Sequence, residues 1–226
     1  LHTETGGAGV QHVKDTAEFN TYGQNTNALF ISHDGSDTME SSVIALGTAS
    51  APAVQTGTFQ LRLGDKTSFN LLGSNNTAVN WTASSTASAN TDIQIDAGAS
   101  FNLPKPNATG VSLTQAGSGN LNLRNAATIS ATAAALQLDN SGAGQSNLSN
   151  SGTLSSSSTT LGAVQIASST PHTITLNNSG NISGARSAIV ATGDENMSLQ
   201  LSNSGQIQKT VADSNAVIDL SATQGS

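Results

Sequence analysis

The residue types of a nucleophilic hydrolase lie together in one short segment, as His33, Asp34, Ser36 and Asp37. A histidine can take the proton of a serine hydroxyl when a carboxylate orients its ring, and the serine oxygen then attacks a carbonyl. Such a triad needs distant chain segments that converge with defined geometry, whereas these four residues are close neighbours. The Gly-x-Ser-x-Gly turn of lipases and esterases is also missing from the sequence. We therefore interpret this segment as a polar loop and predict no catalytic residues.

A second possible chemistry is glycoside cleavage by Asp92 and Asp96, which are four positions apart on one face of an expected strand. Paired carboxylates serve as acid and base or nucleophile in such reactions, and aromatic side chains supply platforms for the sugar rings. The chain has a single Trp, Trp81, a single Tyr and seven scattered basic residues. We interpret both aspartates as solvated charges at strand edges, and we expect no enzymatic activity and no cofactor.

Metal binding has two weak candidates. Residues 33–37 with Glu40 offer oxygen ligands, but they lack the acidic spacing of a calcium loop. Residues 6–9 (Gly-Gly-Ala-Gly) begin like a calcium-binding nonapeptide, yet Val10-Gln11 follows and the pattern occurs once. We predict no metal site, and we expect Asp194, Glu195 and Asp213 to be exposed loop charges.

Composition excludes several classes of partner. Charged residues make up 9% of the 226 residues, and the net charge is −7. Without a basic stripe to neutralise phosphates, nucleic-acid binding and insertion at anionic membrane surfaces are disfavoured. The chain has no cysteine, which suits a secreted protein that crosses a membrane unfolded, and it has no apolar run long enough to span a bilayer. It begins Leu-His-Thr, and we expect a mature or excised piece of a longer protein.

The elements that would have to position any site come from a repeat. One phrase recurs with its asparagine in register, at intervals of 25, 28 and 25 residues: LNLRNAATI, NLSNSGTL, TLNNSGNI and QLSNSGQI, aligned on Asn125, Asn150, Asn178 and Asn203. Taking Asp65 and Ala97 as the equivalents of these asparagines extends the series towards the N-terminus, with intervals of 32 and 28 residues.

Each repeat contains several short strands. We call the aligned asparagine, or its assigned equivalent, the phase point of each repeat. Apolar and polar residues alternate before it, as in TFQLRLGD (58–65) and TDIQIDAG (91–98). This alternation is typical of a strand with one buried face. An apolar residue returns about four positions later, at Phe69, Phe101, Ile129, Leu154, Ile182 and Ile207. Further apolar stretches follow at 78–81, 135–138, 162–166, 187–191 and 216–220.

Short strands at a period of 25 to 32 residues, rich in Asn, Ser, Thr and Gly, predict a parallel β-helix rather than helices or a linker. We predict an all-β chain that forms a right-handed parallel β-helix (β-solenoid) of roughly six to eight coils. Residues 1–54 do not follow the phrase, and we expect an irregular N-terminal cap or first coil there, with the regular coils in residues 55–226.

The recurrent asparagines have a structural explanation in such a fold. The same corner repeats in every coil, so a side-chain amide can hydrogen bond to its copies above and below. We predict a structural ladder of Asn125, Asn150, Asn178 and Asn203, and aliphatic columns inside the coils with small residues such as Ala127 in the narrow parts.

The phrase LxNSGxI, at Leu148–Leu154, Leu176–Ile182 and Leu201–Ile207, resembles the passenger domain of Gram-negative type V autotransporters of the AIDA-like self-associating adhesin group. The resemblance covers roughly residues 55–226, while residues 1–54 do not share it. It implies secretion through an outer-membrane barrel, display on the cell surface and a role in virulence. The Gly-Asp-Ser-Gly nucleophile loop of the protease members is missing, and the same phrase also occurs in two-partner secreted exoproteins.

We therefore expect an extracellular adhesin passenger that promotes aggregation, biofilm formation or host adhesion through a polar β-helix face. Its expected partners are passengers on neighbouring cells, or host or biofilm glycans and surface proteins. The alternatives are a glycan-binding or glycan-cleaving β-helix of the tailspike or lyase type, an ice-binding solenoid and a passive spacer. The sequence does not identify the ligand or the binding face.

Overall fold

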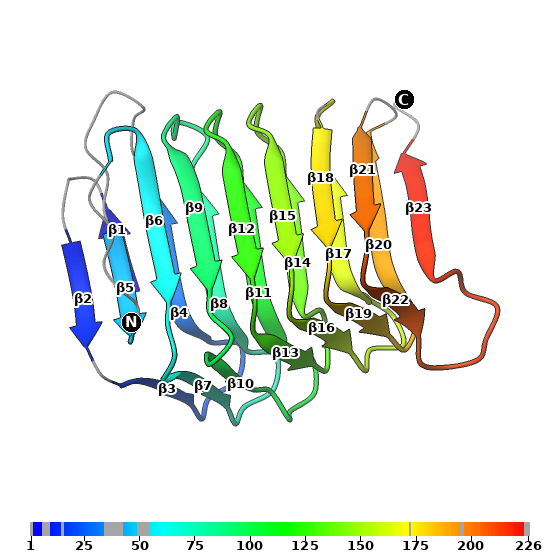
Figure 1. Cartoon of the computed structure of the whole chain (residues 1–226), viewed down its shortest axis with the longest axis horizontal. Coiled ribbons are helices and arrows are strands. Elements are labelled where there is room, and N and C mark those ends of the chain that lie inside the picture. The colour runs from blue at the N-terminus through cyan, green and yellow to red at the C-terminus, as the bar shows by residue number, and fades with distance from the viewer. Residues whose placement is uncertain are drawn as a thin grey trace.

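The computed structural model describes residues 2–5, 10–14, 16–33, 43–48, 55–171, 173–194 and 197–223. These residues contain no helix, so none of them forms a helix capable of crossing a membrane. Their strands form three parallel sheets that line up along one long axis (Figure 1). The all-β solenoid predicted from the repeat is therefore confirmed.

Each sheet takes one strand from almost every turn of the chain. Sheet A contains, in spatial order, β1 (His2–Thr5), β4 (Asn27–His33), β8 (Thr77–Ala83), β11 (Thr109–Gln115), β14 (Leu136–Asn140), β17 (Gly162–Ser168), β20 (Ser187–Asp194) and β23 (Ile218–Thr223). Sheet B contains β2 (Val10–Lys14), β5 (Val43–Gly47), β6 (Thr58–Leu63), β9 (Asn90–Ile95), β12 (Leu121–Asn125), β15 (Ser146–Asn150), β18 (Thr173–Asn178) and β21 (Ser198–Asn203). Sheet C contains β3 (Ala17–Thr21), β7 (Thr67–Leu71), β10 (Ser100–Asn102), β13 (Thr128–Ala131), β16 (Thr153–Ser156), β19 (Asn181–Gly184) and β22 (Gln206–Lys209).

From β6 to β23 the chain passes through sheets B, C and A in that order, six times in succession. In Figure 1 the strands of sheet B run down the front and those of sheet A run up the back while the chain advances to the right, so the winding is right-handed. Every strand lies directly on its copy in the next turn, as in the pairing of Phe69 with Phe101 and of Phe101 with Ile129. The apolar residues that return after each phase point thus form one continuous column in sheet C.

The described strands of residues 1–54 belong to the same three sheets. β2, β3 and β4 make a further B–C–A turn at the N-terminal end. β5 is an additional strand inserted in sheet B between β2 and β6, and it has no counterpart in sheets A and C. The described strands of this part therefore form a coil of the solenoid with one strand added. The coil phrase is missing there because the position of its asparagine is occupied by Leu46 in β5 and by Val13 in β2.

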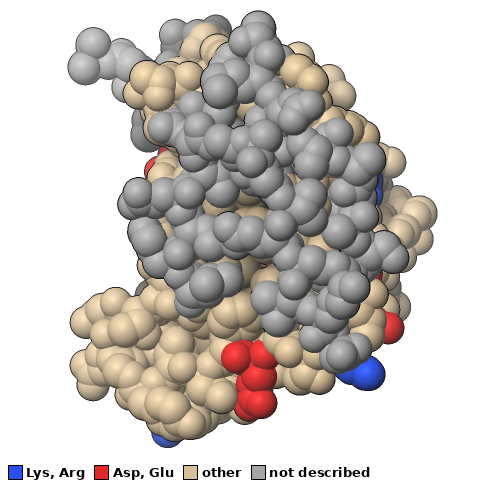
Figure 2. All heavy atoms as spheres, turned by 90° about the vertical axis from the view of Figure 1, so that its left-hand side faces the viewer, with Lys and Arg blue, Asp and Glu red and all other residues tan. Residues whose placement is uncertain are grey.

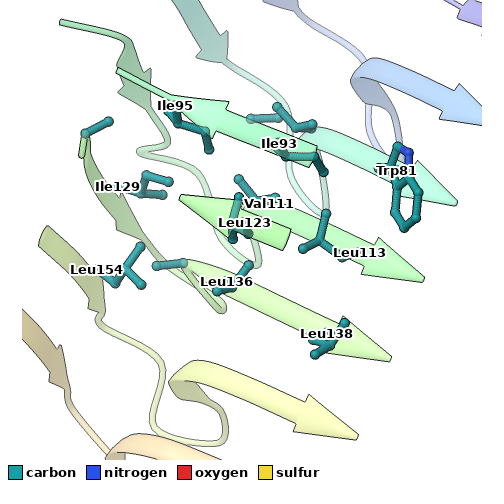
Figure 3. Packing of buried hydrophobic residues seen from close by; sticks show 14 of the residues in the cluster. Trp81, Ile93, Ile95, Val111, Leu113, Leu123, Ile129, Leu136, Leu138 and Leu154 are labelled. Atoms are coloured by element: carbon teal, nitrogen blue, oxygen red, sulfur yellow. The ribbon is translucent and has the colours of Figure 1, made fainter. Parts of the chain in front are cut away.

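The core is a stack of aliphatic columns between the sheets. Figure 3 shows Ile93, Ile95 and Leu123 from sheet B, Ile129 and Leu154 from sheet C, and Val111 and Leu113 from sheet A pointing into the same interior. Most of these side chains are fully buried, each contributing roughly 1.5–3 kcal/mol relative to exposure. The rings of Phe19, Phe69 and Phe101 stack in sheet C with centroids 5.0 Å apart. The core is thin and contains few aromatic residues, and each turn covers the apolar side chains of the turn before it.

The last described turn leaves this core open at the C-terminal end. Leu201 in β21 is 37% exposed and Leu220 in β23 is 62% exposed, although both occupy inward positions in register with buried residues. Their partners one turn earlier, Leu176 and Ala191, are fully buried. The exposure therefore reflects an end face of the stack and not a change of sequence pattern.

Candidate functional site

The corner between sheets B and C is the most ordered polar feature of the described chain. Asn125, Asn150, Asn178 and Asn203 each end a strand of sheet B and pair in register. The Nδ2 of Asn125 donates to Oδ1 of Asn150 (2.9 Å), that of Asn150 to Asn178 (2.8 Å), and that of Asn178 to Asn203 (2.7 Å). The four amides therefore form one chain of hydrogen bonds that runs in a single direction along the axis, and the first three are buried.

Each amide also forms a hydrogen bond within its own corner. Its Nδ2 donates to the carbonyl two residues ahead, for example from Asn150 to Gly152 (3.1 Å) and from Asn178 to Gly180 (3.2 Å). The glycine is required because the coils approach closely at this point. A Cβ on Gly152 would lie 2.1 Å from the carbonyl oxygen of Ala127, and one on Gly180 would lie 2.0 Å from that of Gly152. The Asn-Ser-Gly phrase thus follows from a two-residue corner that is stacked at backbone contact.

The equivalents that we assigned in the two preceding turns are wrong. Asn125 pairs with Ile95, and Ile95 pairs with Leu63, so the aligned positions are these two apolar residues and not Ala97 and Asp65. The corners before β7 and β10 contain three and four residues instead of two. A fixed count of four positions back from Phe69 or Phe101 therefore ends inside the corner and not at the last residue of the sheet B strand. Without the Asn-Ser-Gly corner, the inward position is filled by an aliphatic side chain and the ladder begins at Asn125.

Sequence reasoning missed a second polar column at the corner between sheets A and B. Gln115, Asn140 and Ser168 end successive strands of sheet A in register. Asn140, which is fully buried, donates from Nδ2 to the carbonyl of Gly144 (3.0 Å) and to Oγ of Ser146 (2.9 Å). The common signal was a polar residue two positions after an inward leucine or isoleucine, but its residue type changes at each turn. This corner is buried, and within the described residues Oε1 of Gln115 has no hydrogen-bond partner.

Outside the asparagine ladder the surface is hollowed. A furrow of about 440 Å³ crosses the ends of five strands of sheet B, from β9 to β21. Its lining residues are Gln94, Ile95, Asp96, Arg124, Asn125, Ala126, Ser149, Asn150, Ser151, Asn177, Asn178, Ser179, Ser202 and Ser204. The buried amides of Asn150 and Asn178 therefore lie beneath a groove whose outer residues are mostly small and polar. We call this groove the corner furrow.

The outward face of sheet B has two rows of side chains. In one row Asn147 donates from Nδ2 to Oδ1 of Asn122 (3.0 Å), which links two neighbouring coils. Among the described residues, no hydrogen bond involves the side chains of Thr175 and Gln200 further along this row. The other row runs through Ser149, Asn177 and Ser202 and lines the corner furrow. Within the described residues, no hydrogen bond involves the side chains of these three residues or of Ser204.

Asp92 is not the solvated strand edge that we expected. Its side chain is 20% exposed and lies between two arginines, with Oδ2 2.7 Å from Arg62 and Oδ1 2.9 Å from Arg124. Asp96 directly follows the same strand and accepts a hydrogen bond from Nε2 of Gln94 (2.9 Å). Both carboxylate oxygens of Asp92 are thus engaged in ion pairs that link three turns of sheet B. The two aspartates form no free acid and base pair.

Another pair of described charged residues, Lys209 and Asp213, stabilises the loop after β22. The ammonium of Lys209 at the end of β22 contacts Oδ1 of Asp213 and the carbonyls of Asp213 and Asn215. The Lys209 side chain, together with the backbone amide of Asn215, lowers the pKa of Asp213 below its usual range. Figure 2, which looks onto the N-terminal end, shows only a few acidic and basic side chains among the described residues. Charged side chains are therefore sparse on the described part of this face.

Several residues weighed from the sequence have no described side chains. Asp34, Ser36, Asp37, Glu40, Glu195 and residues 6–9 lie outside the described residues, and for His33 and Asp194 the backbone alone is described. Among the described residues, no group of three or more His, Asp or Glu side chains is arranged to hold a metal ion. Trp81, the single tryptophan, is fully buried and offers no platform to a sugar.

Comparison of the chain with protein-family models, curated proteins and solved structures found no match. The site consists of a corner of buried amides beneath a groove lined mostly by small polar residues.

Proposed function

We propose that the chain is an adhesive shaft, part of an autotransporter passenger displayed outside a Gram-negative cell, which promotes aggregation, biofilm growth or host adhesion. The observation that carries this proposal is the outward face of sheet B. Side chains at the same outward positions recur from turn to turn, and most of them are neutral and polar, including Ser149, Asn177 and Ser202.

Repetition of weak contacts explains how such a surface would adhere. A neutral hydrogen bond contributes a net of about 1 kcal/mol, which is too little for one contact to hold two cells. A rigid rod presents the same contact at every turn, and display of many rods multiplies the number of contacts by avidity. The low charge supports this function because it limits the repulsion between copies that lie side by side.

The described carboxylates support adhesion better than catalysis. Asp92 is engaged by two arginines, and the furrow at the end of its strand contains a single carboxylate, that of Asp96. A glycosidase of the usual kind needs two carboxyl groups that face each other across the scissile bond. We therefore propose binding without cleavage as the function of this surface.

The test is to display the chain on a non-adherent Gram-negative host through an outer-membrane display system. Settling of static cultures is compared with that of cells carrying the same display system without the chain, at equal surface levels of an epitope tag. Cells with the chain should clump and settle faster, and should continue to do so in high salt, because neutral contacts are not screened. Settling equal to that of the control cells would contradict the proposal.

A further inference from the structure

The geometry points to the corner furrow as a binding site for an extended, uncharged polysaccharide that lies along the axis of the solenoid. This inference rests on the proposed adhesive function and assigns to it a site and a class of ligand. The starting observation is the hollow of about 440 Å³ at the ends of β9, β12, β15, β18 and β21. These are strands of sheet B, which runs along the front of the molecule in Figure 1. Its volume is within the usual range for ligand sites.

The polar groups of the furrow are available to a ligand. Ser149, Asn177 and Ser202 lie one above the other in register, and within the described part of the chain their side chains make no hydrogen bond. On the same strands, two positions earlier, Asn147 is already bonded to Asn122 of the preceding turn. Thr175 and Gln200, further along that row, make no described side-chain hydrogen bond either, so the furrow row is distinguished by the hollow that it lines.

The spacing of these groups selects the kind of polymer. Successive turns of a parallel β-helix are roughly 4.8 Å apart, so five strands span about 20 Å. One sugar unit of an extended β-1,4-linked chain has nearly the same length as this rise. Because successive units of such a chain are turned over, equivalent hydroxyls on one face recur about every two turns of the solenoid and can meet alternate Ser or Asn positions. Side chains on one face of an extended peptide repeat at roughly 6.8 Å and would lose this register. A hydroxyl-rich chain thus fits better than a peptide.

The charges of the furrow favour an uncharged chain. Arg124 and Asp96 lie at its N-terminal end, and Arg124 is already paired with Asp92. From β15 onward the lining consists of Ser and Asn, which can pair with hydroxyls but cannot neutralise a charge on every sugar. The floor is rigid because the buried ladder amides of Asn150 and Asn178 are bonded to each other at 2.8 Å. Serine and asparagine rows on a rigid floor lose little side-chain freedom when they bind.

The experiment uses the isotope-labelled chain and NMR titration with four linear hexasaccharides: cellohexaose, mannohexaose, chitohexaose and a hexamer of galacturonic acid as the charged comparison. At least one neutral hexamer should shift the backbone amides of Ser149, Asn177 and Ser202 more than those of Asn147, Thr175 and Gln200. No shift with any neutral hexamer, or shifts away from the furrow, would overturn the proposal. Tighter binding of the charged hexamer, lost in high salt, would also overturn the choice of an uncharged ligand.

Two triple variants then test the site. The furrow triple is Ser149→Val, Asn177→Val and Ser202→Val. The matched triple on the same strands and the same face is Asn147→Val, Thr175→Val and Gln200→Val. Valine suits an outward strand position, so both triples should keep the dispersed amide spectrum of the folded chain. The furrow triple should weaken binding by about tenfold or more, as expected for the loss of two or three neutral hydrogen bonds, whereas the matched triple should change it less than about twofold. Equal effects of the two triples would refute the assignment of the furrow.

Failure of this inference can be told apart from failure of the adhesive function. If cells that display the furrow triple still settle like those with the unchanged chain, and the soluble chain binds no hexamer, the adhesive function stands and the furrow is not its site. If the soluble chain forms dimers in sedimentation experiments without glycan, and the furrow triple abolishes them, the furrow binds a second copy of the chain and the glycan assignment is wrong.

Discussion

Replacing Asn178 by alanine tests whether the asparagine ladder stabilises the fold. Asn178 is 2% exposed, and its Oδ1 accepts from Asn150 at 2.8 Å. Its Nδ2 donates to Oδ1 of Asn203 at 2.7 Å and to the carbonyls of Gly180 and Gln206 at 3.2 Å each. The variant thus removes four contacts at once from a buried corner.

The expected loss of stability follows from these contacts. A net hydrogen bond is worth about 1 kcal/mol, but partners that remain satisfied reduce the sum. Nδ2 of Asn150 keeps the carbonyl of Gly152, and the carbonyl of Gly180 keeps the backbone amide of Gln206 at 2.8 Å. The two ladder bonds and the small void should together cost about 2–4 kcal/mol in the free energy of unfolding.

Asn203→Ala is the matched control, because Asn203 occupies the same corner but is exposed in the last described turn. Water can replace its lost partners, so its cost should be below about 1 kcal/mol. The measurement is the urea midpoint of unfolding, followed by circular dichroism and checked for coincidence with refolding. Equal midpoints for the two variants, or a cost below about 1 kcal/mol for Asn178→Ala, would refute the claim that burial makes the ladder stabilising.

Two further predictions concern the corners and the charges. Gly180→Ala should destabilise the chain by about 2 kcal/mol or more, because the new Cβ would lie 2.0 Å from the carbonyl oxygen of Gly152. In the control Gly23→Ala the new Cβ meets nothing closer than 3.5 Å, so stability should change by less than about 0.5 kcal/mol. Similar urea midpoints for the two variants would contradict this prediction. The lowered pKa of Asp213 means that its contact with Lys209 stabilises the folded loop above the usual aspartate pKa and is lost as the pH falls through the lowered value. Lys209→Met should return the Asp213 pKa towards its usual range in a carboxyl NMR titration, and an unchanged titration would show that Lys209 is not the cause.

The fold was predictable because the same sequence phrase recurs with its apolar residues at fixed distances from one asparagine. The inward residues Leu148, Leu176 and Leu201 stand at the same distance from the ladder asparagine in each turn, and their pairing in register is what the alignment of the phrases implied. A repeated residue at a stacked corner has few physical explanations, and a hydrogen-bonded amide column is one of them. Register, sheet membership and core direction all follow from this single phase.

The parts that could not be predicted are those where the phase is broken. Corners of three and four residues before β7 and β10 displaced the aligned positions to Leu63 and Ile95. The apolar run at 43–46 predicts a strand, which β5 (Val43–Gly47) confirms. Because its residues are buried on both faces, it shows no alternation of polar and apolar residues, and its insertion into sheet B could not be predicted. The ion pairs of Asp92 depend on Arg62 and Arg124, which are about thirty positions away on either side and become neighbours only through the register of three turns.

The inward and the outward side chains at the sheet B corner are under different physical constraints, and this difference supports the assignment of the furrow as a binding site. Inside, Asn178 and Gly180 are fixed by hydrogen bonds and by backbone contact, and other residue types fail there for steric or polar reasons. Outside, Ser149, Asn177 and Ser202 contact no described hydrogen-bond partner, and a strand position open to solvent accepts many residue types. Threonine or valine would stabilise an outward strand position better than serine or asparagine, so folding does not explain the polar row. We propose that its composition reflects what the furrow binds, and the two valine triples separate that contribution from the stability of the shaft.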